Sequence, residues 1–192
     1  MPAAATQRQL AYAEYLAQEA NAHEKHEYVD GISYAMSGGT PAHGRLTLNF
    51  ARLLGNALIE RPCVLLSSDV RIRIEAAHRS FYPDLSVVCH ALEHASDDAD
   101  AVCNPCLVVE VLSDSTEAYD RGEKFFFYRQ LPSLQEYVLV SQHTPHVEIF
   151  RRRPDHWQLH EAHAGAQVQL TSLHVAFAVD DLYQDPLAPR DA

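Results

Sequence analysis

The sequence contains no uninterrupted apolar run of the roughly 18 residues that a membrane-spanning helix requires. Its first residues, 1–8, also lack the long apolar stretch of a secretory signal peptide. Internal repeats and low-complexity tracts are absent as well. These absences predict a cytoplasmic protein with no membrane partner, and the length of 192 residues predicts one domain covering residues 1–192.

Cysteine is scarce. The chain has four, which are too few for a disulfide scaffold at this length. Cys103 and Cys106 form a single C-x-x-C motif, and Cys89 and His94 are near enough in the sequence to complete a zinc site. No second paired motif accompanies them, and small buried thiols are ordinary at strand ends. A structural zinc site at these cysteines is therefore the weaker interpretation.

Positive charge is also scarce. The chain has 15 Lys and Arg against 26 Asp and Glu, which gives a formal net charge of -11. Binding to DNA depends largely on Lys and Arg that neutralise phosphates, so the whole surface is not expected to attract nucleic acid. A local basic groove or a contact bridged by a metal remains compatible with this charge. The acidic residues at 97–100 are predicted to lie in a solvated loop.

One acidic residue occupies an unusual place. Glu110 lies in the apolar run 107–112, which predicts a strand buried on both faces. An ionised carboxylate is unfavourable there unless a metal or another charge pairs with it. Asp84 begins a second apolar stretch, within a strand predicted over 81–89. Two such acids suit Mg²⁺, which prefers a few carboxylates plus water. Alternatively, Asp84 caps a turn and Glu110 pairs with a structural Arg or Lys.

A lysine follows these acids on a helix predicted over 117–130. Asp120, Lys124 and Tyr128 share one face of that helix at four-residue spacing. If the helix packs on the Glu110 strand, Lys124 can orient a nucleophile or stabilise a charged transition state. The alternative is a surface ion pair between Asp120 and Lys124, which contributes little stability. Tyr128 is expected in the core, with its hydroxyl bonded to a neighbour.

The remaining pattern predicts a mixed α/β fold with helices flanking a central sheet. One amphipathic helix is predicted over 6–20, and a second begins at Thr40 and Pro41, which suit the cap and the first helical position. Asp30-Gly31 predicts a hairpin turn. Further strands are predicted at 63–66, 70–74, 105–112, 137–140 and 147–150, followed by an antiparallel tail at 157–161, 168–170 and 173–177.

Several motifs are similar to those of one known family. They are Tyr82-Pro83-Asp84, Pro105-x-Leu107-Val108-Val109-Glu110-Val111-Leu112-Ser113-x-Ser115-Thr116, Asp120-x-x-x-Lys124-x-x-x-Tyr128, Glu136-Tyr137, Glu27-x-x-Asp30-Gly31 and His43. Together they resemble the Uma2 family, long called a domain of unknown function (DUF820). That family is grouped with the PD-(D/E)xK restriction-endonuclease-like nucleases. The resemblance extends from about residue 8 to about residue 183, which we take as the core of the domain.

The resemblance implies a restriction-endonuclease-like core, with a central mixed sheet flanked by helices and antiparallel C-terminal strands. Asp84 and Glu110 would be the two motif acids and would hold Mg²⁺ or Mn²⁺. The nuclease motif has a lysine two residues beyond the second acid, where this chain has Leu112. In the Uma2-like pattern that lysine lies on the following helix, which makes Lys124 the third catalytic residue.

Two further residues are candidates for the same site. The resemblance implies that Glu27, on an N-terminal element, joins the metal site, although it could instead be a surface residue of a hairpin. His43, near the start of a helix, could approach the site or serve only as a surface or capping residue. Asp69 precedes the strand predicted over 70–74, and it could likewise approach the site or only shape a turn. The histidines without ligand-like spacing are interpreted as solvated, and they are His90, His94, His143, His146, His156, His160, His163 and His174.

Two functions follow from this resemblance. The first is a divalent-metal-dependent endonuclease that hydrolyses nucleic-acid phosphodiester bonds, with DNA as the expected substrate, a homodimer as the expected assembly and no cofactor beyond the metal. The second is a nuclease-fold protein without activity that serves as a binding or assembly module. The acidic charge and Leu112 favour the second function, whereas the joint presence of Asp84, Glu110 and Lys124 favours the first.

Overall fold

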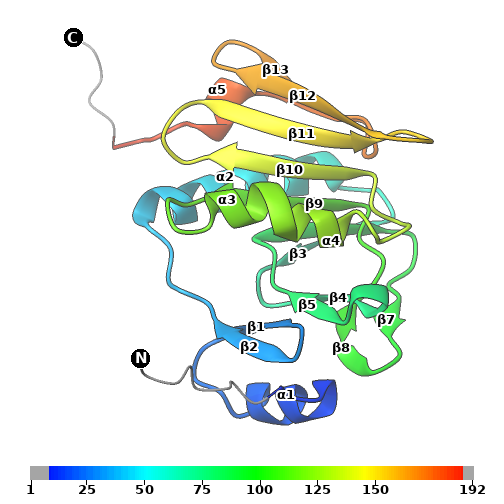
Figure 1. The fold of residues 1–192 in the computed structure, drawn as a ribbon. Helices are drawn as coiled ribbons and strands as arrows, with labels where there is room; N and C mark the ends of the chain where they lie inside the picture. Colours follow the sequence, from blue (N-terminus) through cyan, green and yellow to red (C-terminus); the bar gives the residue numbers. More distant parts are fainter. Residues whose placement is uncertain (1–8, 188–192) are drawn as a thin grey trace.

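The mixed α/β fold is confirmed by a computed structural model, which describes residues 9–187 (Figure 1). The described strands form two mixed six-stranded sheets and one hairpin. The N-terminal sheet has the order β2 (Ile32–Ala35), β1 (His26–Val29), β5 (Arg79–Phe81), β4 (Arg71–Ile74), β8 (Asp98–Val102) and β7 (His94–Ala95). The central sheet has the order β12 (Trp157–His163), β11 (His146–Arg152), β10 (Glu136–Ser141), β9 (Leu107–Leu112), β6 (Leu85–Cys89) and β3 (Cys63–Ser67).

The helices and the hairpin complete the fold. They are α1 (Tyr12–Glu19), α2 (Pro41–Leu58), η1 (Glu75–Ala77), α3 (Glu117–Tyr119), η2 (Asp120–Lys124), α4 (Phe125–Tyr128), α5 (Val179–Leu182), and the hairpin β13 (Gln167–Leu170) to β14 (Val175–Ala178). The helix predicted over 6–20 begins at Tyr12, and residues 6–8 lie outside the described part. No helix within residues 9–187 is long and apolar enough to span a membrane.

Strand β9 lies between the two hydrophobic cores of the molecule, and every residue of it is buried. Val109 and Val111 face the core that α2 covers, together with the β13–β14 hairpin. Val108 and Leu112 face the other core, which α4 and strands β4 and β5 help to form. Because side chains alternate along a strand, Glu110 shares the face of Val108 and Leu112. Glu110 therefore points toward the α3–α4 segment and the N-terminal sheet.

Helix α2 follows the prediction from its sequence closely. The Thr40 hydroxyl accepts a hydrogen bond from the His43 backbone N–H at 3.1 Å, and Pro41 occupies the first helical position. This cap fixes the first turn of the helix, which carries His43. The buried stripe of the helix then packs on the central sheet and consists of Leu46, Phe50, Leu54 and Leu58.

The strand predicted over 81–89 is in fact two strands in different sheets. Strand β5 ends at Phe81 in the N-terminal sheet, and β6 begins at Leu85 in the central sheet. Pro83 lies between them and has no backbone N–H to donate to a ladder, which suits a break in pairing. The break carries the chain from one sheet to the other, and it leaves Asp84 at the head of β6.

The acidic stretch at 97–100 does not form the predicted solvated loop. Asp98 begins β8, is 5% exposed, and pairs with Arg71 of β4 at 2.9 Å. Its neighbour Asp97 pairs with Arg73, which is itself only 2% exposed, at 2.7 Å. The prediction is wrong for Asp98, which Arg71 neutralises so that it can begin a strand, whereas Asp97 lies in the turn before β8 and Asp100 is exposed.

Two cysteines also differ from the prediction. Cys63 of β3 and Cys89 of β6 lie opposite each other in the sheet and form a disulfide, so Cys89 is not a free buried thiol. Cys103 and Cys106 are free. Among the described residues, the group of potential ligands close enough to share one ion includes no cysteine. The geometry therefore gives no support to zinc at the C-x-x-C motif.

Candidate active site

Lys124 lies between carboxylates from three different elements. Its Nζ is 2.9 Å from Glu110 Oε1 on β9 and 3.0 Å from Glu27 Oε1 on β1. The carboxylate of Asp120, one helical turn earlier, lies 3.7 Å from the same Nζ. Asp120 and Lys124 are 4% and 5% exposed, so they do not form a surface ion pair. Glu27 is likewise mostly buried, rather than exposed on the hairpin.

The segment that carries Lys124 is not the regular helix predicted over 117–130. A π-helical turn, η2, separates the short helices α3 and α4, and the helical segment ends at Tyr128. Single π turns inside helices occur frequently at functional sites. The buried hydroxyl of Tyr137 donates a hydrogen bond of 3.0 Å to the Asp120 carbonyl at the start of this turn. This bond fixes the turn that directs both Asp120 and Lys124 toward Glu110.

Asp84 lies beside Glu110 and is held by two contacts. Its Oδ2 accepts a hydrogen bond of 2.7 Å from the Val111 N–H and lies 3.2 Å from His43 Nε2. The Asp84 N–H in turn donates to Glu110 Oε2 at 3.4 Å. The side chain of Asp84 is therefore fixed next to the backbone that follows Glu110. The structure thus brings the predicted residues Asp84, Glu110, Lys124, Glu27 and His43 into one cluster.

This cluster opens to solvent through a cavity of about 370 Å³. Its wall includes the charged residues of the cluster, and these are Glu27, His43, Asp84, Glu110, Asp120 and Lys124. Other parts of the wall come from the β2–α2 connection and from the segment after β9. Because both sheets contribute residues, the site depends on the way that the break around Pro83 joins the two sheets.

The cluster contains more negative than positive groups. Burial raises the pKa of Glu110 well above its ordinary value, and the carboxylates of Asp120, Asp84 and Glu27 raise it further, against the effect of Lys124. Burial likewise raises the pKa of Asp120. Four carboxyl groups face one ammonium and one imidazole, and a divalent cation would offset the repulsion among them.

The pKa values of Lys124 and His43 are also raised, which for these two groups favours the charged form. Burial alone would lower the pKa of Lys124, but the carboxylates of Glu110, Glu27 and Asp120 outweigh it and raise that pKa well above its ordinary value. The hydrogen bond to Asp84 raises the pKa of His43. Lys124 therefore holds its proton.

The oxygen ligands of Asp84 and Glu110 fit Mg²⁺ or Mn²⁺. Hard divalent cations prefer carboxylate oxygens and water, and these two carboxylates border the cavity side by side. Asp120 also belongs to the cluster, although the sequence did not identify it as a site residue. Its spacing of four residues before Lys124 was the available indication, but the same spacing also fits an ordinary surface pair.

Two other residues can be compared with their predicted environments. Tyr128 is fully buried as predicted, but its hydroxyl has no hydrogen-bond partner among residues 9–187, so the predicted bond is wrong. Asp69 lies outside the cluster, where it pairs with Lys25 at 3.0 Å and accepts a hydrogen bond from Ser67. Its position agrees with a role in shaping the turn before β4.

Comparisons with known proteins agree with one another. Residues 12–180 match the Uma2 family, described as "Putative restriction endonuclease". Two relatives are uncharacterized proteins of Synechocystis sp. One, slr1290, is 40% identical over 172 residues, which cover 89% of this chain and 90% of that protein. The other, sll1609, is 38% identical over 162 residues, which cover 84% of this chain and 92% of that protein.

A solved structure also has a similar fold. It is a crystal structure described as a putative nuclease belonging to DUF820, from Anabaena variabilis. The TM-score is 0.74 at 16% sequence identity, and the alignment covers 91% of this chain and 97% of the other. At this level of identity, the match bears on the fold and not on the substrate.

Proposed function

The chain belongs to the Uma2 family, and we propose that it is a divalent-metal-dependent endonuclease that hydrolyses nucleic-acid phosphodiester bonds. One observation carries the proposal. A lysine and four carboxylates from both sheets meet at one solvent-accessible cavity, although burying such a group of charges is costly for a fold. Perturbed charged groups that gather in a cleft are typical of catalytic sites.

Asp84 and Glu110 are the proposed metal ligands. A bound Mg²⁺ or Mn²⁺ would supply Lewis-acid activation of water and would stabilise charge on the phosphate. The residues of the chain prepare this site in advance. The Val111 N–H and His43 fix the Asp84 carboxylate, and the Asp84 N–H fixes Glu110. Such supporting contacts orient a ligand before the metal arrives.

Lys124 is proposed to stabilise the negative charge that develops on the scissile phosphate. Its raised pKa keeps the ammonium protonated, so it acts as a cation and hydrogen-bond donor and not as a base. Glu27 and Asp120 hold its Nζ near Glu110. Leu112, at the position of the motif lysine, is instead part of the apolar core that also contains Phe125.

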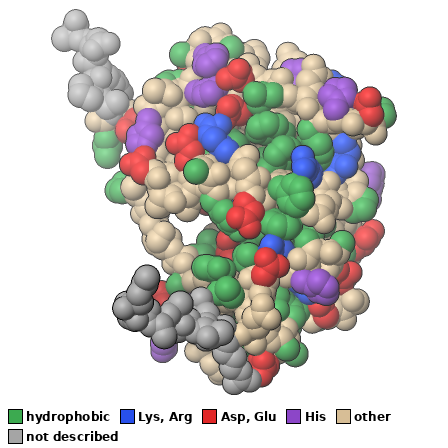
Figure 2. All heavy atoms as spheres, in the orientation of Figure 1, with side chains coloured by type: hydrophobic (Ala, Val, Ile, Leu, Met, Phe, Trp, Pro, Cys, Tyr) green, Lys and Arg blue, Asp and Glu red, His purple; other side chains and the backbone are tan. Residues whose placement is uncertain are grey.

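A binding or assembly module without activity is the second candidate function. The net charge of -11 favours it, and the few Lys and Arg side chains on the face in Figure 2 are separated and do not form one patch. The endonuclease proposal accommodates this observation if metal ions at the cluster provide the main contact with phosphate. DNA is the proposed substrate, and a homodimer would allow both strands to be cut.

The test is cleavage by purified, tag-free protein of supercoiled plasmid, single-stranded DNA and RNA, each with Mg²⁺, Mn²⁺ or EDTA. We expect cleavage of at least one substrate that requires the metal and disappears in Asp84→Asn and Glu110→Gln. Unchanged cleavage by both variants would show that it arises elsewhere or from a contaminant. Absence of cleavage of every substrate by the parent protein, together with binding of nucleic acid, would favour the binding module.

A further inference from the structure

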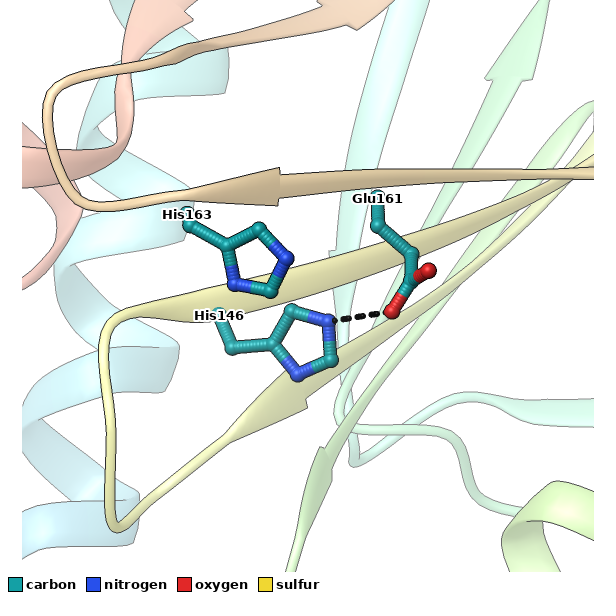
Figure 3. Close-up of side chains that lie close together, drawn as sticks. All are labelled: His146, Glu161 and His163. Carbon is teal, nitrogen blue, oxygen red and sulfur yellow. Dashed lines mark hydrogen bonds and ion pairs between the residues drawn. The ribbon is translucent and has the colours of Figure 1, made fainter.

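A second group of potential metal ligands lies on the outer strands of the central sheet, apart from the acid cluster. Figure 3 shows His146 of β11 and Glu161 and His163 of β12. The two imidazole rings are stacked, with centroids 4.4 Å apart and ring planes 7° from parallel. His146 Nε2 is 3.0 Å from Glu161 Oε1, and one ligand atom from each residue lies within 4.8 Å of the others.

Strand register brings these residues together. His146 lies directly opposite His163 in the antiparallel β11–β12 pair, and Glu161 lies two residues before His163 on the same face. Glu161 is therefore the diagonal neighbour of His146. The interpretation that His146 and His163 lack ligand-like spacing is wrong in this respect, because the spacing is created across the two strands and not along the chain.

Hydrogen bonds fix the backbone at His146, whereas the ring of His163 is less constrained. The Tyr183 hydroxyl accepts a hydrogen bond from the His146 N–H at 3.2 Å and donates one to the Ser141 carbonyl at 2.6 Å. This anchors the start of β11. Within the described part of the chain, the ring nitrogens of His163 have no hydrogen-bond partner. The next acid along this face of β11, Glu148, is already paired with Arg121. Among the described residues, Glu161 has no ion pair with a Lys or Arg, and its partner is His146.

We propose that His146, Glu161 and His163 bind Zn²⁺, with solvent as the fourth ligand. Zinc commonly takes imidazole nitrogens and a carboxylate oxygen at about 2.0–2.2 Å, which places tetrahedral ligands about 3.3 Å apart. Glu161 and His163 are exposed, so their side chains can change rotamer toward that spacing. The two imidazoles select a transition metal over Mg²⁺, which prefers oxygen ligands. This chemistry separates the group from the cluster around Glu110.

A zinc ion here would cross-link β12, the edge strand of the central sheet, to β11. The expected role is therefore stabilisation of the sheet edge. A ligand that binds only the folded state raises the melting temperature, and at a hundredfold excess over Kd the expected shift for a chain of this size is about 5–10 °C.

The experiment is calorimetric titration of tag-free, full-length protein with Zn²⁺, together with thermal melts in Zn²⁺ and in EDTA. We expect one high-affinity site, whose Kd rises at least about 10-fold in His163→Gln and in Glu161→Gln. His156→Gln is the matched control, because His156 is also exposed and paired with a carboxylate, Asp155, but has no third ligand beside it. That variant is expected to bind Zn²⁺ like the parent protein.

The outcomes separate this proposal from the endonuclease. Zinc affinity and the thermal shift should persist in Glu110→Gln, and Mg²⁺ should not displace the zinc. If His163→Gln and Glu161→Gln bind Zn²⁺ as tightly as the parent protein, the site lies elsewhere and the proposal is wrong. Absence of any zinc-dependent shift in the parent melting temperature would contradict it as well.

Discussion

Two buried glutamates on neighbouring strands differ in how their charge is balanced. Glu136 of β10 and Glu110 of β9 lie on parallel, adjacent strands, and they are 0% and 4% exposed. Glu136 accepts hydrogen bonds from Arg151 Nε at 2.8 Å and from the backbone N–H groups of Thr171 and Ser172 at 3.2 and 3.0 Å. Both of its oxygens therefore have donors, as a structural carboxylate requires.

Glu110 has a much poorer set of partners. Among the described residues, its contacts are the 3.4 Å hydrogen bond from the Asp84 N–H and the ion pair with Lys124, which Glu27 and Asp120 share. A fold gains nothing from gathering acids around one lysine, because burying unneutralised charge is unfavourable. The contrast supports the proposal that Glu110 serves the chemistry of the cavity, whereas Glu136 serves the fold.

The largest expected effect is on activity at Glu110. Glu110→Gln and Asp84→Asn should each lower metal-dependent cleavage about 1000-fold, since each removes a proposed metal ligand. Stability should stay level or rise, because the substitution removes excess buried charge. Cleavage rates and urea unfolding of the same preparations measure both effects. A variant of Glu110 that loses stability but retains activity would reverse the assignment of the two glutamates.

Removal of the Lys124 ammonium, which the surrounding carboxylates share, should have the largest effect on stability. Lys124→Met leaves the surrounding carboxylates without their ammonium, and we expect the free energy of unfolding to fall by about 3 kcal/mol in EDTA. Mg²⁺ should restore part of this loss by neutralising the same acids. Lys124→Arg keeps the charge and is the matched control. Equal stability of Lys124→Met with and without Mg²⁺ would argue against a metal at the cluster.

Glu136→Gln tests the structural side of the comparison. This change leaves the buried Arg151 without its charged partner, and we expect a loss of about 2 kcal/mol in the free energy of unfolding. Cleavage per folded molecule should remain at the parent level. Chemical unfolding and an activity assay below the melting transition give the two values. A large drop in activity without a loss of stability would show that Glu136 also takes part in the site.

His43 should have a smaller effect, through Asp84. His43→Gln removes the imidazole beside Asp84 Oδ2, which orients the carboxylate, and we expect about 10-fold weaker Mn²⁺ binding. Calorimetric titration with Mn²⁺ measures this directly. The stabilities of the variant and the parent protein in EDTA should be similar, because His43 lies at the mouth of the cavity. Unchanged Mn²⁺ affinity would remove His43 from the site.

The smallest expected effect concerns acid stability at Asp98. Burial works against the charged form, but Arg71 and Tyr12 outweigh it and hold the pKa of Asp98 below its ordinary value. The contribution of about 1 kcal/mol should be present above the unfolded-state pKa of about 4 and disappear as the pH falls through the lower folded-state pKa. Asp98→Asn should flatten this acid limb in urea unfolding from pH 3 to pH 7. If the free energy of unfolding falls with pH equally in Asp98→Asn and in the parent protein, other acids cause this dependence.

Local sequence patterns predicted the helices and strands that are determined by neighbouring residues in the sequence. The cap formed by Thr40 and Pro41 predicted α2, and the apolar run around Glu110 predicted β9. The second sheet was not predicted, because the acids at the start of β8 fit beside β4 only when Arg71 and Arg73 pair with them. Contacts between distant residues decided these elements, and no local pattern carries that information.

The candidate site shows the same division between what local sequence patterns predict and what contacts between distant residues determine. The positions of Asp84, Glu110 and Lys124 were available from motif spacing and from the resemblance to Uma2. Their distances were not, since they depend on the π turn at Asp120 and on the break at Pro83 that joins the two sheets. The same limit concealed the His146–His163 pair, whose register depends on the packing of two outer strands.

The most direct test of the central claim is a crystal structure of the protein soaked with Mn²⁺, with anomalous differences measured near the manganese absorption edge. The account predicts an anomalous peak held by the carboxylates of Asp84 and Glu110, with Lys124 Nζ within about 4–6 Å of it. A crystal that shows manganese only elsewhere, with Lys124 still paired to Glu110, would contradict the account.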